Sequence, residues 1–185
     1  MQLTVRSVAY VAREEGLAKE AYYDSATPPN LTWSMGLTKA AGVNVQQYVN
    51  RPAPIEVCLR AAIARLDAAF LPQVNRAFAG HALNDAQLAA AIGFEWNTGA
   101  IQRADWVHHW TGGNSIAARQ DLENNYLDGG ELKARRAREA KLFFDNAWPA
   151  DMRCPVWQVR HPSLRPFSPV PTDIVPVLQQ IMGGS

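Results

Sequence analysis

Apolar side chains recur at helical spacing at the start of the chain. Val5, Val8 and Ala12 fall on one face of the segment Leu3–Glu15, and this periodicity predicts a helix. Gly16 follows as its C-terminal stop, because glycine readily takes the left-handed conformation that ends many helices. We therefore expect a helix over residues 3–15.

Two short extended segments come next. Ala21–Asp24 and Leu31–Thr38 are typical of strands, and the loop 25–30 between them contains Pro28-Pro29. Proline fixes φ and lacks a backbone N–H donor, so no helix continues through this loop. The pattern predicts one small β element near the N-terminus.

Helical periodicity dominates the middle of the chain. Pro54 opens a long helix that reaches Phe70, and Pro72 bends or ends it. Asn84, with Gln87 three residues later, predicts a capping box before another helix. Further helices are expected at Ala100–Trp110, Ser115–Leu127 and Glu131–Asn146. A helical body with one small β element is an α+β fold.

The last part of the chain differs in composition. Residues 149–185 hold seven of the twelve prolines, and such a segment favours extended or polyproline conformations. A regular helix is expected there only at Ile174–Ile181. We therefore divide the chain into a domain at 1–148 and a Pro-rich extension at 149–185.

Two roles fit this extension. It is either a docking or wall-binding arm, or a segment that packs over the body through Trp157, Phe167 and Val170. The three apolar side chains favour packing, because a free arm is normally polar throughout.

Composition and charge narrow the function classes. With 185 residues, of which 48% are hydrophobic, the chain can bury one core, or one core plus an appendage. Its formal net charge of +1 provides no broad cationic field, which argues against electrostatic capture of nucleic acid or an acidic membrane. Apolar runs are too short to span a bilayer, and the N-terminus lacks the apolar core of a signal peptide.

The cysteines and histidines give no pattern typical of a metal site. Cys58 and Cys154 are far apart and have no metal-ligand spacing. A long-range disulfide stays open, but two reduced, partly buried thiols are favoured in a chain without an export signal. The adjacent His108-His109 point apart on a helix and make a poor zinc pair.

Two carboxylates and a hydroxyl near the β element are the candidate catalytic groups. Glu15 lies at the end of the first helix, where the negative end of the macrodipole favours the neutral form that a general acid requires. Asp24 closes one strand and Thr32 returns on the next, so both can face the same side as Glu15. The alternative is a solvated surface cluster in which Asp24 only forms a turn.

Three ordered motifs carry a family resemblance. Glu15-Gly16 is followed by Asp24 nine positions later (15 to 24) and then by Thr32. The downstream motifs are Phe94-x-x-Asn97-x-Gly99 and Leu132-x-x-Arg135-Arg136-x-x-Glu139-x-x-Leu142. Together they resemble the phage-type lysozymes of glycoside hydrolase family 24 over roughly residues 1–147. The resemblance implies a lysozyme-like α+β fold whose N-terminal hairpin lines a cleft.

The resemblance assigns a role to each member of the trio. Glu15 would be the general acid, Asp24 the carboxylate that stabilises charge or activates water, and Thr32 the group that holds that water. The expected reaction is hydrolysis of the β-1,4 MurNAc–GlcNAc bond of peptidoglycan by acid/base catalysis. No metal and no organic cofactor is implied.

Three further residues are expected to bind the glycan. Trp33 can stack on a sugar ring, because it sits on the hairpin of the implied cleft. Asn97 is a sugar contact or, alternatively, a buried structural amide. Arg136 is our choice for the arginine that approaches the catalytic Glu15 in the family. The alternative is that the basic run Lys133, Arg135, Arg136 and Arg138 is a solvated helix face, with pairs Glu131–Arg135 and Arg135–Glu139.

Departures from the family pattern bear on specificity and activity. The gap from Asp24 to Thr32 is two residues longer than the family pattern, and Pro28-Pro29 fills it; Ser34 replaces a hairpin glycine. The alternative to an enzyme is therefore a non-catalytic peptidoglycan-binding or scaffold domain on the same fold.

The expected partners and location follow from the same resemblance. We expect glycan strands of peptidoglycan as the partner, with no nucleic acid, no stable membrane insertion and a monomeric protein. Without a signal peptide, the chain would be made in the host cytoplasm and released to the wall with the help of a holin.

Overall fold

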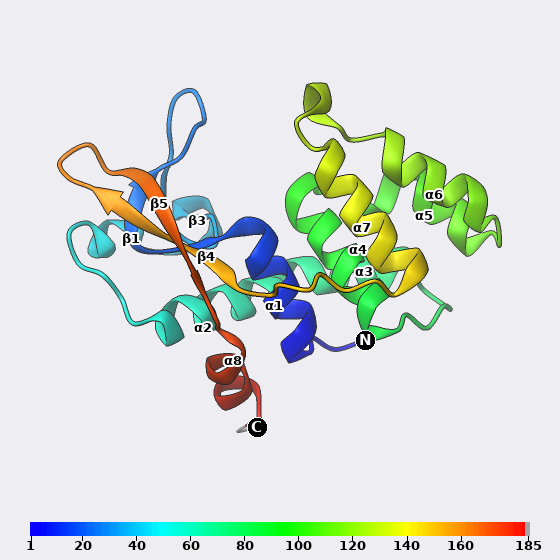
Figure 1. The fold of residues 1–185 in the computed structure, drawn as a ribbon, viewed down its shortest axis with the longest axis horizontal. Coiled ribbons are helices and arrows are strands. Elements are labelled where there is room, and N and C mark those ends of the chain that lie inside the picture. The colour runs from blue at the N-terminus through cyan, green and yellow to red at the C-terminus, as the bar shows by residue number, and fades with distance from the viewer. Residues whose placement is uncertain (184–185) are drawn as a thin grey trace. The chain divides into compact units, whose positions relative to one another are not determined.

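The computed structural model describes residues 1–183, and these residues form two compact units (Figure 1). The helical unit contains residues 1–11 and 66–150. The sheet unit contains residues 12–65 and 151–183. The first helix belongs to both, because its last turn, from Ala12, is counted with the sheet unit.

The strands come in two groups separated by a run of helices, as the α+β prediction requires. The helices are α1 Val5–Glu15, α2 Ile55–Arg65, α3 Leu71–Ala77, α4 Asp85–Thr98, α5 Asp105–Thr111, α6 Ser115–Asn124, α7 Lys133–Asp145 and α8 Val175–Met182. The strands are β1 Leu17–Tyr23, β2 Leu31–Ser34, β3 Leu37–Thr38, β4 Cys154–Arg160 and β5 Arg165–Thr172. The α+β class is confirmed, and no helix among residues 1–183 is long and apolar enough to cross a bilayer.

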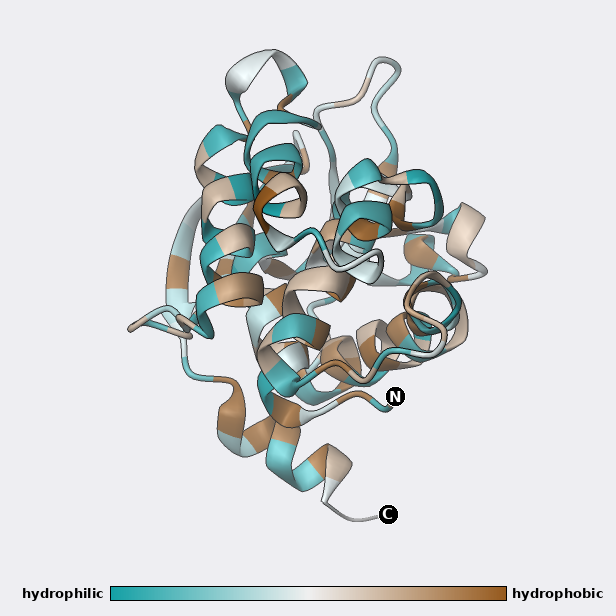
Figure 2. Ribbon diagram, turned by 90° about the vertical axis from the view of Figure 1, so that its right-hand side faces the viewer, coloured by the Kyte–Doolittle hydropathy of each residue, from teal (hydrophilic) through white to brown (hydrophobic). Residues whose placement is uncertain are grey.

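Helix α4 lies at the centre of the helical unit. Its residues from Leu88 to Phe94 are all buried, as expected for a helix surrounded by others. The predicted capping box is confirmed: Asn84 accepts from the backbone N–H of Gln87, and the Gln87 side chain accepts from that of Asn84. In Figure 2, brown hydrophobic and teal hydrophilic residues alternate around the helical ribbons, as amphipathic packing requires.

An aromatic cluster completes the core of this unit. Trp106 makes edge-to-face contacts with Phe94 and Phe143, with ring centroids 5.4 and 5.1 Å apart. Phe78 lies 5.8 Å from Trp106 by the same measure. Such pairs stabilise a core beyond the area they bury.

The sheet unit is built on one mixed sheet of five strands among the described residues, in the order β3-β2-β1-β4-β5. β1 pairs antiparallel with β2 and parallel with β4, so it is an interior strand. β5 is one of the two edge strands and carries Pro166, Pro169 and Pro171. Proline is tolerated at a sheet edge, where its missing N–H has no strand partner to satisfy, and it discourages pairing with another chain.

Several predicted elements need correction. The extended segment 31–38 is not one strand: it turns at Met35-Gly36, where Gly36 has φ +83°. The helix expected from Pro54 to Phe70 is α-helical only to Arg65 and continues as a π-helical segment over Leu66–Phe70. Pro72, expected to bend or end it, lies in the first turn of α3, where no intrahelical N–H is required. The helix expected over 100–110 is interrupted at Ala104, whose backbone is extended.

The Pro-rich extension forms strands rather than a polyproline segment. β4 and β5 pair with each other along most of their length, and β4 pairs with β1. The helix expected near residue 174 is confirmed as α8. Trp157 and Phe167 are half-buried, whereas Val170 is 50% exposed and takes little part in packing.

Candidate active site

Asp24 is held as an ionised carboxylate immediately after β1. Its Oδ1 accepts from the backbone N–H groups of Asn30 (2.8 Å) and Ala26 (3.1 Å), and its Oδ2 accepts from the Asn30 side-chain amide at 3.1 Å. Partial burial raises the pKa of Asp24, but these hydrogen bonds outweigh it, so the pKa lies below its ordinary value. Asp24 is therefore charged at neutral pH.

Thr32 lies on the neighbouring strand with its hydroxyl close to the same carboxylate. Its Oγ1 is 3.4 Å from Oδ2 of Asp24 and 3.2 Å from the carbonyl oxygen of Asn30. The residue is only 2% exposed. Because β2 pairs with β1 at Tyr22↔Thr32, sheet register fixes this hydroxyl relative to Asp24.

Glu15 is the last residue of α1, and its side chain is half-exposed. Gly16 follows with φ +72° and turns the chain directly into β1. That left-handed conformation is accessible to glycine at little cost. A helix end and a strand start therefore meet at one residue, which places Glu15 at one end of β1 and Asp24 at the other.

Tyr22 reports the combined field of the two carboxylates. Burial, then the charge of Asp24 and then that of Glu15, raise the pKa of the Tyr22 hydroxyl to about 12. A negative charge disfavours a neighbouring phenolate. Both Glu15 and Asp24 are thus close enough to one side chain of β1 to act on it.

The structure corrects the role expected for Trp33. The side chain is 1% exposed and stacks on Tyr48 with ring centroids 3.7 Å apart. Its indole N–H donates to the carbonyl oxygen of Lys19 at 3.0 Å. Trp33 has no free face for a sugar ring, because it packs inside the sheet unit and supports the hairpin that carries Thr32.

Asn97 and Arg136, the other two predicted glycan contacts, are in direct contact within the helical unit. The guanidinium of Arg136 donates to Oδ1 of Asn97 at 2.6 Å. This bond fixes the orientation of the amide, since its oxygen is engaged and its NH₂ group is directed elsewhere. Asn97 itself is half-buried.

Local capping explains why Asn97 is presented at this position. It lies in the last turn of α4, which ends at Gly99 in the left-handed conformation (φ +58°). Glu95, 6% exposed, accepts from the backbone N–H of Ile101 at 2.9 Å and fixes the chain after the helix. Burial raises the pKa of Glu95 despite that hydrogen bond and the nearby charge of Arg103.

The basic run on α7 is not simply a solvated face, as the alternative interpretation had it. Arg135 and Arg136 are 8% and 0% exposed, and Glu139 between them is fully buried. Oε1 of Glu139 accepts from Arg135 at 3.0 Å and from Arg136 at 3.2 Å, so the expected Arg135–Glu139 pair is confirmed. Arg135 also donates to the carbonyl oxygen of Gly93 at 2.9 Å. Buried charges need such partners to be tolerated.

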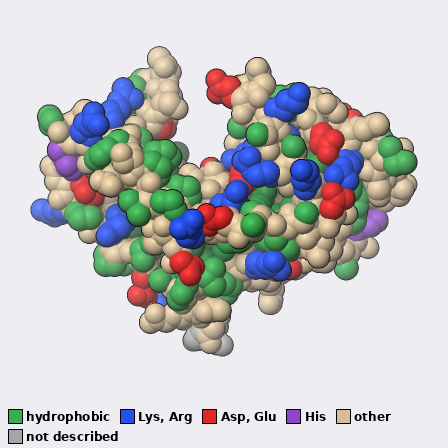
Figure 3. Space-filling model, in the orientation of Figure 1, with side chains coloured by type: hydrophobic (Ala, Val, Ile, Leu, Met, Phe, Trp, Pro, Cys, Tyr) green, Lys and Arg blue, Asp and Glu red, His purple; other side chains and the backbone are tan. Residues whose placement is uncertain are grey.

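On the outer surface the charges are mixed. Figure 3 shows acidic and basic side chains interspersed over the helical unit on the face in view, without a continuous patch of one sign. Among residues 1–183, no three His, Cys, Asp or Glu side chains are arranged to hold a metal ion. In this described part of the chain, Cys58 and Cys154 are buried free thiols.

The sheet unit therefore contains groups of the kinds that acid/base glycosidases use. One carboxyl lies at a helix end, a second carboxylate is kept charged by hydrogen bonds, and a buried hydroxyl contacts the second. Asn30 and Tyr22 complete this arrangement and were missed by the sequence analysis. Asn30 gave a weak signal, since Asn two residues before Thr32 ends the insertion and can bond back to Asp24.

Comparison with family models shows the family to which this chain belongs. The model described as phage lysozyme matches residues 12–139. The chain belongs to the phage lysozyme family. Membership supports a glycoside hydrolase directed at peptidoglycan.

Solved structures share the fold of this phage lysozyme family member. An endolysin from Escherichia coli O157:H7 phage FAHEc1 is 22% identical, with a TM-score of 0.63 over 80% of this chain and 97% of that one. A mutant of the lysozyme of phage P22 is 22% identical, with a TM-score of 0.63 over 77% and 98%. The muramidase domain of SpmX from Asticaccaulis excentricus is 21% identical, with a TM-score of 0.59 over 77% and 97%. Among curated proteins no match was found.

Proposed function

We propose that this protein is an endolysin-type muramidase that hydrolyses the β-1,4 MurNAc–GlcNAc bond of peptidoglycan. The observation that carries the proposal is the Asp24 carboxylate, which hydrogen bonds keep charged beside Thr32. Asp24 and Thr32 lie on the paired strands β1 and β2, and Glu15 ends the helix just before β1. Inverting and retaining glycosidases both need one protonated and one ionised carboxyl group. The family match supports the same reaction class.

In the proposed mechanism, Glu15 protonates the glycosidic oxygen as the bond to the anomeric carbon breaks. The charged Asp24 stabilises the positive charge that develops on the sugar or removes a proton from the attacking water. Thr32 holds that water, because its hydroxyl lies 3.4 Å from the Asp24 carboxylate and can accept as well as donate. The water oxygen bonds to the anomeric carbon, and its proton passes to Asp24 or to solvent. The starting state returns when Glu15 takes a proton from solvent and Asp24, where it has accepted one, releases it.

Asn97 is proposed as a further glycan-binding residue, whereas Arg136, which is fully buried, supports it without contacting the glycan. The engaged oxygen of Asn97 leaves its NH₂ group as a hydrogen-bond donor for a sugar hydroxyl or N-acetyl carbonyl. Arg136 orients that amide. We also propose that the protein acts as a monomer and reaches the wall after holin-dependent release from the host cytoplasm.

The proposal is tested on purified sacculi with four variants. Glu15→Gln and Asp24→Asn are expected to lose activity by about 100-fold or more, since general acid–base groups contribute factors of this size. Thr32→Ala should lose less. Glu56→Gln is the matched control: it makes the same chemical change in the same unit, at a partly exposed carboxylate that pairs with Arg60 at 2.8 Å rather than with the trio.

Mass spectrometry of the released muropeptides identifies the bond. Reducing muramic acid ends are expected for a muramidase, whereas anhydro ends would indicate a transglycosylase and peptide cleavage an amidase. Equal clearance by the wild type, Glu15→Gln and Asp24→Asn would refute the assigned mechanism. Binding to sacculi without any released fragment would instead establish a non-catalytic wall-binding domain.

A further inference from the structure

The hairpin formed by β4 and β5 lies outside the part of the chain that the family model matches. The match covers residues 12–139, whereas the hairpin spans residues 154–172. It is nevertheless joined to the strand that connects the two proposed catalytic carboxyls. β4 runs parallel to β1, with Leu17 opposite Val156 and Ala18 opposite Trp157.

Trp157 packs directly on the residue that follows Glu15. A Cβ atom placed on Gly16 would lie 2.5 Å from Nε1 of Trp157 and 3.0 Å from its Cδ1. The same Cβ would lie 3.1 Å from the carbonyl oxygen of Pro155. The indole and the β4 backbone therefore fill the space over Gly16 and leave room for glycine alone.

The hairpin also contacts the other end of β1. The backbone N–H of Tyr23, the residue before Asp24, donates to the carbonyl oxygen of Leu164 at 2.8 Å. Between the two ends, His161 lies 3.0 Å from Glu20. The hairpin thus holds β1 at its Glu15 end, along its length and at its Asp24 end.

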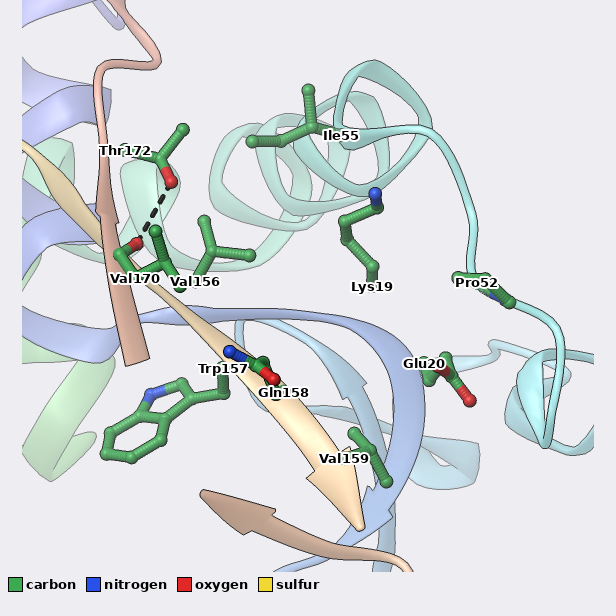
Figure 4. Close-up of a pocket in the computed structure, with 10 residues that line it drawn as sticks. All are labelled: Lys19, Glu20, Pro52, Ile55, Val156, Trp157, Gln158, Val159, Val170 and Thr172. Atoms are coloured by element: carbon green, nitrogen blue, oxygen red, sulfur yellow. Dashed lines mark hydrogen bonds between the residues drawn. The ribbon is translucent and has the colours of Figure 1, made fainter. Parts of the chain in front are cut away.

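Figure 4 shows on which side of β4 the indole lies. The ring of Trp157 points away from Lys19 and Ile55, although all three residues line the same groove of about 570 Å³. The side chain is half-buried, and its partner there is the Gly16 end of β1. Its packing is thus directed at the Glu15–Gly16 turn.

We propose that the β4–β5 hairpin fixes the geometry of the Glu15 and Asp24 carboxyls, and that Trp157 is the positioning residue for Glu15. The inference rests on the proposed muramidase function. Without the hairpin, β1 would be an edge strand and the Glu15–Gly16 turn would be bounded on one side by solvent. Small displacements of reacting groups lower rates steeply, by about 100-fold for a shift near 1 Å.

Three variants test this role. Trp157→Ala removes the indole, and Trp157→Phe retains an aromatic ring over Gly16. Phe167→Ala is the matched control: it removes a half-buried aromatic side chain from the same hairpin, at a ring that lies 5.0 Å from the Arg160 guanidinium. The substrate is soluble glycan strands freed from sacculi by an amidase, and kcat and KM are measured beside the thermal unfolding midpoint.

Trp157→Ala is expected to lower kcat by about 10-fold or more with KM changed less than about twofold, because substrate binding is intact while the acid is misplaced. Trp157→Phe should restore kcat to within about threefold. Phe167→Ala should retain wild-type kcat even where its unfolding midpoint falls. If Trp157→Ala does not fold, Trp157→Leu, which keeps apolar bulk without a flat ring, replaces it with the same expected loss of kcat.

Three outcomes would overturn the inference. They are wild-type kcat in Trp157→Ala, an equal loss of kcat in Phe167→Ala, and a rise in KM alone, which would make Trp157 a glycan contact instead. Failure of the proposed function is separate and visible in the wild type, which would then release no fragments from the same strands.

Discussion

Replacing Asn30 with alanine should shift the acid side of the pH–activity profile upward. The change removes the side-chain amide that donates to Oδ2 of Asp24 at 3.1 Å, and it leaves the two backbone donors at 2.8 and 3.1 Å in place. A hydrogen bond to a charged group contributes about 1.5–3 kcal/mol when buried. Solvent screening at this half-exposed site reduces that to about 0.5–1 kcal/mol, which corresponds to roughly 0.4–0.7 of a pH unit.

The sign of this shift follows from the hydrogen bonds. They hold the pKa of Asp24 below its ordinary value, so losing one of them lets the pKa rise and leaves less of the carboxylate charged at low pH. The acid limb of kcat/KM reports the free enzyme and should move up by about half a pH unit, while the rate on the plateau changes little. The stability that the ionised Asp24 contributes is present above the unfolded-state pKa and is lost as pH falls through the folded one.

The assay is kcat/KM on solubilised glycan strands from pH 3 to 8. Asn44→Ala is the control, because Asn44 is an exposed asparagine of the same unit whose side chain makes no capping hydrogen bond. An acid limb that stays in place or moves down in Asn30→Ala would show that the amide does not stabilise the charge of Asp24.

Two further predictions concern buried groups. Glu139→Gln should lower the free energy of unfolding, measured by urea titration, by about 3–5 kcal/mol. The reason is that it leaves the buried guanidiniums of Arg135 and Arg136 without this carboxylate. A loss below about 1 kcal/mol would contradict the buried-pair argument. Burial raises the pKa of the Cys58 and Cys154 thiols to about 12, so at pH 8 only about one in 10⁴ of each is thiolate. A thiol-specific dye should therefore label them only as urea unfolds the protein, and rapid labelling of the folded state would refute their burial.

Short-range signals in the sequence predicted the local structure well. The Asn84–Gln87 capping box and the stop at Gly16 each involve residues within one turn of each other, so the pattern alone determines them. The partner of β1 could not be found in this way. Ala18 and Trp157 face each other across 139 positions (18 to 157), and nothing in the β4 sequence specifies which strand it joins.

Spacing indicated the proposed trio, but burial determines which of the other predicted site residues a substrate can reach. Trp33 and Arg136 were chosen for their chemistry, and both are almost completely buried. A sequence shows that a tryptophan or arginine is present, whereas its exposure depends on packing partners such as Tyr48 or Glu139 that come from distant segments. The interpretation of a run of charges as a solvated face fails where the helix also carries a buried carboxylate such as Glu139.

Position 16 shows how the extension and the proposed chemistry depend on each other. Gly16 has φ +72°, a conformation that any residue with a Cβ adopts at a cost, and the indole of Trp157 also occupies the space where that Cβ would go. Removing the indole relieves the second constraint and leaves the first. Gly16→Ala should therefore destabilise the protein less in a Trp157→Ala background than in the wild type, and the difference measures the coupling between the hairpin and the Glu15 turn. Strict additivity would mean that the hairpin rests on β1 without constraining it.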